Sequence, residues 1–104
     1  MSFLRRLFGL GPAVDMKALV DEGAIIVDVR TKGEFQQGHI KNAMNIPVDS
    51  IGSNLSKLKN KDKTIITCCA SGMRSGTAKN ILKSKGYEKV YNGGAWTSLN
   101  RKIE

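Results

Sequence analysis

Hydrophobic residues along this chain fall into two unbroken runs rich in β-branched side chains, with helical spacing between them. The runs cover 24–29 (Ala-Ile-Ile-Val-Asp-Val) and 64–68 (Thr-Ile-Ile-Thr-Cys). Continuous runs of this kind are typical of strands that are buried on both faces of a parallel sheet. Weaker strand signals lie at 43–46, which Pro47 ends, and at 89–91. We therefore expect a small sheet built around the two long runs.

Helix signals occupy the segments between the strands. Asp15 is a suitable N-cap for a helix over Met16, Leu19 and Val20, and Gly23 would end it. Further helices are expected from a capping box of Thr31 and Glu34 up to Gly38, as short turns at 49–58, and at 75–85 and 95–100. Strands that alternate with helices predict an α/β fold: a small, mostly parallel sheet flanked by helices on both faces.

The charge balance is strongly basic, which raises the question of a nucleic-acid partner. The 104 residues carry 17 Lys and Arg against 9 Asp and Glu, for a net charge of +8. The lysines are scattered, however, and the chain holds only one Trp, two Tyr and three Phe, so no aromatic platform is expected. We predict no nucleic-acid partner; the positive field instead favours small anionic substrates.

The N-terminal residues 1–12 form a short amphipathic segment, and 13–104 form the domain. Two arginines interrupt the apolar residues of this segment, and no clean cleavage site follows. No apolar run approaches the ~20 residues that span a bilayer. We expect a cytoplasmic protein without stable membrane insertion, and a monomer.

The only two cysteines are adjacent, at Cys68 and Cys69. Neighbouring cysteines cannot connect distant elements, which fits a reducing compartment. His39 is the only histidine and no C-x-x-C spacing occurs, whereas a structural zinc site needs four ligands. We therefore expect no metal and no cofactor.

The segment after the second strong strand run has the features of a reactive anion site. It runs from Cys69 directly into a helix, whose N-terminus offers unpaired N–H groups and the positive end of a dipole. Gly72 permits a tight backbone turn, and Arg74 adds a forked cationic donor. A thiol in this field should have a lowered pKa. The pattern predicts Cys69 as a loop nucleophile and Cys68 as a buried, inert thiol.

Three motifs, in the same order along the chain, resemble the signatures of the single-domain rhodanese-like family. The motifs extend over about residues 13–100 and differ from the family pattern at two places. The segment Asn92-Gly93-Gly94 lacks the leucine that often precedes the glycine pair, and Cys68 stands where many members have an aromatic residue. The motifs are Asp28-Val29-Arg30 with Glu34-Phe35 and 38–47, then Cys69-x-x-Gly72-x-Arg74-Ser75, then Gly86-Tyr87 with 90–94 and Trp96.

The resemblance implies a thiosulfate sulfurtransferase that carries sulfane sulfur as a Cys69 persulfide. The donor would be a small anion such as thiosulfate or a persulfide, and the acceptor a thiol, a protein persulfide or cyanide. Arg74 would help to hold the anionic donor. The backbone amides that would cradle the sulfur and the donor belong to Ala70, Ser71, Gly72, Met73, Arg74 and Ser75.

Two alternatives remain open at this stage. Counted from Cys69 the loop reads C-x4-R, but counted from Cys68 it reads C-x5-R, the spacing of cysteine-dependent phosphatases and arsenate reductases. The chain could also be a non-catalytic module that carries sulfur or binds a partner.

Other polar residues of the motifs are expected to be structural. Asp28 and Glu34 would anchor the backbone and cap a helix, and His39 would be a satisfied turn residue. Arg30 would lie near the pocket or pair with a carboxylate, and Trp96 would anchor the last helix in the core.

Overall fold

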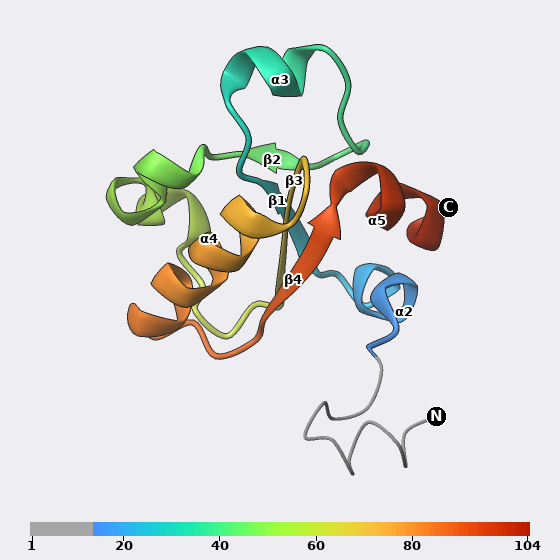
Figure 1. Cartoon of the computed structure of the whole chain (residues 1–104). Helices are drawn as coiled ribbons and strands as arrows, with labels where there is room; N and C mark the ends of the chain where they lie inside the picture. Colours follow the sequence, from blue (N-terminus) through green and yellow to red (C-terminus); the bar gives the residue numbers. More distant parts are fainter. Residues whose placement is uncertain (1–13) are drawn as a thin grey trace, which may run out of the picture.

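Four parallel strands form a single sheet at the centre of the molecule (Figure 1). The computed structural model describes residues 14–104, so the predicted amphipathic segment 1–12 lies outside the described residues. The strand order is β2-β1-β3-β4, with each neighbouring pair parallel. The strands are β1 (Ile25–Asp28), β2 (Met44–Asn45), β3 (Ile65–Cys69) and β4 (Val90–Ala95). The prediction of a small parallel sheet is confirmed.

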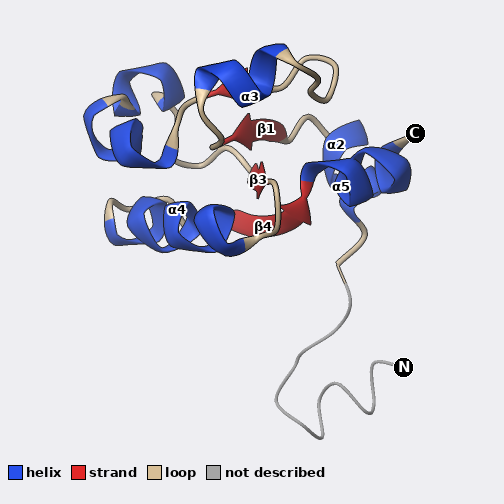
Figure 2. Ribbon diagram, turned by 45° about the horizontal axis from the view of Figure 1, so that its top comes forward, coloured by secondary structure: helices blue, strands red, loops and turns tan. Residues whose placement is uncertain are grey.

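Helices cover both faces of the sheet, as predicted (Figure 2). One face carries α4 with the two 3₁₀ helices, and the other carries α2 with α5. The helical elements are α2 (Met16–Asp21), α3 (Lys32–Gln36), η1 (Val48–Ser53), η2 (Leu55–Leu58), α4 (Met73–Ser84) and α5 (Trp96–Ile103). Within residues 14–104, no helix has the length and hydrophobicity needed to cross a bilayer.

The local signals for the first two helices act as the sequence predicts. Asp15 caps α2 because its Oδ1 accepts a hydrogen bond from the Ala18 amide at 3.0 Å. At α3 the capping box is complete: Thr31 Oγ1 accepts from the Glu34 amide, and Glu34 Oε1 accepts from the Thr31 amide. Both caps satisfy N–H groups that the first helical turn would otherwise leave unpaired.

The sheet separates two hydrophobic cores, and the adjacent cysteines belong to different ones. Successive side chains of a strand point to opposite faces. Cys69 therefore packs on the α4 side, in the cluster that contains Val27 and Leu82. Cys68 packs on the α5 side, with Ile66 and Leu99.

Element boundaries differ from the predicted ones around the segment that joins β3 to α4. Cys69 is the last residue of β3 and not the first residue of the loop. Helix α4 begins at Met73, two residues before the predicted start at residue 75. The prediction that β4 ends at 91 before a glycine turn was wrong, since the strand continues to Ala95.

Gly93 explains why β4 can continue through the glycine pair. A Cβ at this position would lie 2.8 Å from Ile66 Cγ2 and 2.9 Å from Leu99 Cδ2. Contacts this short do not occur for real Cβ atoms, so α5 can pack onto the sheet here only over a glycine. The glycine therefore marks a close approach of a helix and not a turn.

Candidate active site

The candidate site lies at the carboxyl edge of the sheet, where three strands end side by side. β1 ends at Asp28, β3 at Cys69 and β4 at Ala95, and Cys69 is opposite Ala95 in the β3–β4 register. In open parallel sheets this edge is where ligands bind. The short segment 70–72 connects Cys69 to α4, so the first turn of that helix faces the end of β3.

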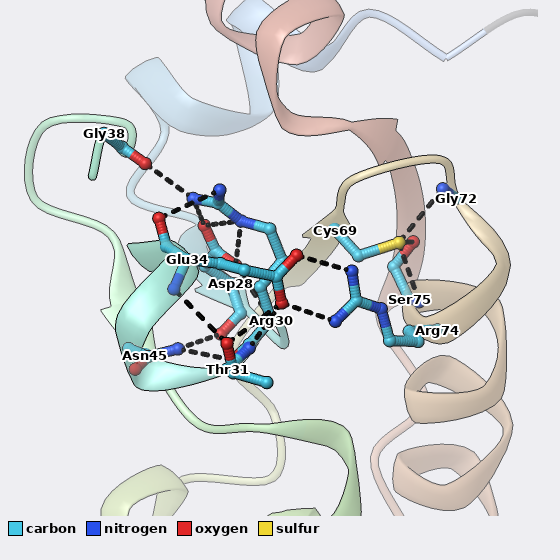
Figure 3. A network of polar contacts seen from close by, with 10 residues as sticks. All are labelled: Asp28, Arg30, Thr31, Glu34, Gly38, Asn45, Cys69, Gly72, Arg74 and Ser75. Atoms are coloured by element: carbon cyan, nitrogen blue, oxygen red, sulfur yellow. Dashed lines mark hydrogen bonds and ion pairs between the residues drawn. The ribbon is translucent and has the colours of Figure 1, made fainter. Parts of the chain in front are cut away.

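The Cys69 sulfur sits within hydrogen-bonding distance of this first turn (Figure 3). The Gly72 amide donates to Sγ at 3.0 Å and the Ser75 amide at 3.4 Å, and Ser75 Oγ also lies 3.4 Å from Sγ. Gly72 has φ of +102°, a left-handed backbone conformation that residues with a Cβ rarely adopt. The chain turns at this residue, and the Gly72 amide faces the sulfur. Cys69 itself is buried, whereas the next two residues, Ala70 and Ser71, are exposed. The sulfur is thus covered by a thin loop.

These contacts lower the pKa of the Cys69 thiol. Burial by itself raises this pKa, but hydrogen bonds from the Ser75 side chain and from the amides of Ser75, Gly72 and Ser71 act in the opposite direction, and the net shift is downward; the Ser75 side chain contributes only when its hydroxyl proton points at the sulfur. Hydrogen bonds to the charged form favour the thiolate. The thiolate is the nucleophilic form of cysteine, so the site is arranged for attack by Cys69.

Cys68 has the opposite character. It is fully buried in the apolar cluster on the α5 side, and burial, together with the nearby Asp28 charge, raises the pKa of its thiol to about 12. A thiol of this kind is neutral at physiological pH and behaves as a small hydrophobic side chain. The structure therefore confirms that Cys68 is buried, and its lack of reactivity stays a prediction.

Arg74 forms a bidentate ion pair with Glu34 across the site. Its Nη1 and Nη2 lie 2.7 Å and 3.0 Å from the two carboxylate oxygens, and both side chains are about one-third exposed (Figure 3). The pair holds the pKa of Glu34 at about 2 through hydrogen bonds from Arg74, aided by those from Thr31. The same pair raises the pKa of Arg74. The guanidinium is thus already balanced by a carboxylate, and its predicted contact with the donor stays a prediction.

A second, buried ion pair supports the end of β1. Arg30 Nε and Nη2 donate to the Asp28 carboxylate at 2.7–3.1 Å, and Nη2 also donates to the Gly38 carbonyl at 2.7 Å. The Arg30 guanidinium lies 4.7 Å from the centre of the Trp96 ring. Arg30, Glu34, Gln37, Gly38 and Trp96 line a pocket of about 290 Å³ beside the Glu34–Arg74 pair. As predicted, Asp28 anchors neighbouring groups and Arg30 pairs with a carboxylate. Trp96, the first residue of α5, packs against the hydrophobic core on the α5 side of the sheet, also as predicted.

His39 is a turn residue, as the sequence predicts. Its Nδ1 lies 2.7 Å from the Phe35 carbonyl oxygen, and its ring stacks on the Phe35 ring at 3.7 Å. Among residues 14–104, no group of three or more His, Cys, Asp or Glu side chains is arranged to hold a metal ion.

Comparison with known proteins decides the family. The model of the rhodanese-like domain matches residues 12–97. The chain belongs to this family.

Two solved structures are similar to this rhodanese-like chain over most of their length. A rhodanese from E. coli is 33% identical with a TM-score of 0.68, and the match covers 72% of this chain and 89% of that one. The human single-domain sulfurtransferase TSTD1 is 26% identical with a TM-score of 0.76, over 90% of this chain and 99% of that one. Most of each relative's length is therefore matched.

Curated relatives include larger proteins. A tRNA uridine(34) hydroxylase of Escherichia fergusonii is 35% identical over an alignment of 86 residues, and the match covers 77% of this chain and 25% of the hydroxylase. The chain spans about a quarter of the length of the curated relatives it matches.

The rhodanese-like site also contains two residues whose positions sequence reasoning missed. Glu34 was expected only to cap α3, and the capping box accounts for it so completely that nothing in the sequence indicates a partner 40 positions away. Asn92 was noted only as a departure from the family pattern. It accepts a hydrogen bond from Ser75 Oγ at 2.6 Å and donates to the Gly72 carbonyl at 3.0 Å.

Proposed function

We propose that this chain is a sulfurtransferase that moves sulfane sulfur from thiosulfate or a persulfide donor to a thiol or cyanide, through a Cys69 persulfide. The observation that carries the proposal is the position of the Cys69 sulfur, which accepts hydrogen bonds from the Gly72 and Ser75 amides at a helix N-terminus. A cysteine whose pKa is lowered in this way is a suitable covalent catalyst.

The first half-reaction forms the persulfide. The Cys69 thiolate attacks the outer sulfur of thiosulfate, a new S–S bond forms, and the old S–S bond breaks so that sulfite leaves with the bonding electron pair. Preoriented amides of the loop stabilise the negative charge that remains on the bound sulfur. No general base is required, because the thiol is already prone to ionise.

The second half-reaction returns the enzyme to its starting state. An acceptor thiolate or cyanide attacks the outer sulfur of the persulfide, and the Cys69 thiolate leaves. Because the two substrates react in turn with the same sulfur, ping-pong kinetics are expected. We propose that the acceptor approaches Cys69 from the side of the loop 70–72, where Ala70 and Ser71 are exposed.

The position of Cys68 counts against the phosphatase or arsenate reductase alternative. A C-x5-R enzyme would use Cys68 as its nucleophile, but this thiol is buried in the α5-side core and its pKa is raised to about 12. It lies on the face of the sheet opposite to Cys69, and the loop amides of Gly72 and Ser75 point to Cys69.

The remaining parts of the proposal concern partners and location. We propose a cytoplasmic monomer that acts on a small anionic donor, with no nucleic-acid partner. The comparison with the human single-domain sulfurtransferase supports sulfur transfer by a domain of this size, because the match covers 99% of that chain. The activity of the tRNA uridine(34) hydroxylases is not proposed for this chain, which matches only a quarter of their length.

The test is incubation of the purified protein with thiosulfate, followed by intact mass measurement and an assay of thiocyanate after addition of cyanide. Wild type and Cys68→Ala should gain one sulfur atom and turn over, and Cys69→Ala should do neither. A mass gain from a protein persulfide without turnover of thiosulfate would favour the carrier module. Hydrolysis of an aryl phosphate that is lost in Cys68→Ser and kept in Cys69→Ser would favour the phosphatase. The absence of any mass gain with either donor would refute sulfur transfer.

A further inference from the structure

The Asn92 side chain makes three hydrogen bonds, two that connect β4 to Gly72 and Ser75 and one to Gly94 of its own strand, and backbone atoms determine how its amide is oriented. The Gly72 carbonyl can only accept, so the group 3.0 Å from it is Nδ2. The Gly94 amide can only donate, so the group 2.9 Å from it is Oδ1. Both ends of the side-chain amide are therefore assigned by its partners.

This orientation determines where the hydroxyl proton of Ser75 lies. Ser75 Oγ is 2.6 Å from Asn92 Oδ1, which has no hydrogen to donate, so the Ser75 hydroxyl must donate. A hydroxyl has a single proton. Toward Cys69 Sγ, 3.4 Å away, Ser75 Oγ therefore presents a lone pair. This arrangement suits a neutral S–H donor but not a sulfur anion.

We propose that Asn92 is a positioning residue of the Cys69 loop: it holds the Ser75 hydroxyl proton away from the sulfur and leaves the Cys69 anion to the backbone amides. The consequence for turnover rests on the proposed sulfur transfer, but the hydrogen-bond assignment does not. While the Ser75 hydroxyl donates to Asn92 it gives a sulfur anion no hydrogen bond, whereas an unrestrained hydroxyl could donate one.

The surrounding structure shows that this contact is built into the fold. A Cβ at position 76 would lie 3.3 Å from Asn92 Nδ2, so Gly76 on α4 leaves room for the amide to reach Gly72. Thr67 Oγ1 donates to the Ser75 carbonyl at 2.8 Å, which holds Ser75 from β3 independently of Asn92. A change at Asn92, whose side chain is exposed, should therefore release the hydroxyl proton without moving Ser75 itself.

The charged groups around Cys69 stay the same when Asn92 or Ser75 is changed to alanine. On α4 and α3 these are Arg74 and Glu34, which pair with each other; Asp28 at the end of β1 and Arg30 just after it also pair. Cys68, on β3, has its pKa raised to about 12 and is neutral at working pH. The segment of β4 that faces the sulfur contains no charged side chain (Asn92, Gly93, Gly94 and Ala95).

The experiment is a double-mutant cycle with the pKa of Cys69 as its readout. The pH dependence of iodoacetamide alkylation, followed by peptide mass mapping of Cys69, is measured for wild type, Ser75→Ala, Asn92→Ala and the double variant. In the Asn92→Ala background the freed hydroxyl donates to the thiolate, so Ser75→Ala should raise the pKa there by about one unit. In the wild-type background Ser75→Ala should raise it by less than half that amount.

An equal effect of Ser75→Ala in both backgrounds would overturn the proposal. Asn92→Asp is the control that keeps an acceptor for the Ser75 hydroxyl. Its added charge is present both with and without Ser75→Ala, so it cancels in the comparison, and the effect of Ser75→Ala should again be small. If Asn92→Asp instead behaves like Asn92→Ala, the tie to Gly72 and not the orientation of the hydroxyl is what matters, and the proposal fails. Alkylation needs no sulfur donor, so this readout remains valid even if wild type gains no sulfur from thiosulfate.

Discussion

The two adjacent cysteines should differ in reactivity by more than a thousandfold in the folded protein. Cys68 has a pKa of about 12, whereas an ordinary thiol has 9.0. At pH 8 this leaves about one Cys68 thiol in ten thousand ionised, against about one in ten for an ordinary thiol. Cys69 is more ionised than the ordinary thiol because its pKa is lowered. The thiolate fraction alone therefore separates the two residues by at least about a factor of a thousand.

Access to a reagent acts in the same direction. Both sulfurs are buried, so alkylation requires a local opening. At Cys69 the opening involves the loop 70–72 with its exposed residues, whereas at Cys68 it involves the packing of Leu99 from α5. Loops at a sheet edge open at a lower free energy than core packing does.

The assay is iodoacetamide alkylation at pH 8, with each cysteine followed separately by peptide mass mapping. Cys69 should be modified first, and Cys68 only on the timescale of global unfolding. Cys68→Ala should leave the rate at Cys69 unchanged, and urea should make the two residues react alike. Folded protein in which Cys68 reacts within tenfold of Cys69 would refute the reasoning, and with it the choice of nucleophile.

Three further predictions concern the frame of the site. Gly93→Ala should destabilise the fold by about 2–3 kcal/mol, because the new Cβ meets Leu99 at 2.9 Å; urea denaturation measures this. Asp28→Asn should cost about 3–5 kcal/mol, since it leaves the buried Arg30 charge without its partner; thermal unfolding gives the value. Glu34→Gln should flatten the acid limb of the stability curve: the Glu34 pKa is about 2 folded and 4.5 ordinarily, so its contribution is present above pH 4.5 and is lost as the pH falls toward 2.

Each of these has a contrasting outcome or control. Gly33→Ala, where an added Cβ meets nothing within 4 Å, should be neutral or slightly stabilising, and an equal loss at Gly33 and Gly93 would contradict the steric argument. Asp28→Asn at wild-type stability would mean that the buried pair is dispensable. Parallel acid limbs for wild type and Glu34→Gln would show that the Glu34–Arg74 pair does not persist in solution.

Local sequence determined most of the elements and singled out Cys69 as the proposed nucleophile. The runs that contain Ile25 and Ile65 are strands because they are apolar and β-branched, and α2 and α3 begin at the caps that Asp15 and Thr31 provide. The spacing from Cys69 to Arg74 placed the reactive cysteine before a helix N-terminus. These features depend on neighbours within a few positions, and a single sequence records such neighbours directly.

Only the tertiary structure decided what the polar groups of the site do. Glu34 meets Arg74 across 40 positions, and Asn92 meets Ser75 across 17, because parallel strands bring their carboxyl ends to one edge. Gly93 continues β4 because α5 packs on it at close range, a contact that no local pattern shows. The segment that contains the proposed nucleophile, Cys69, is recognisable locally, whereas the orientation of the groups around it depends on how the sheet brings distant segments together.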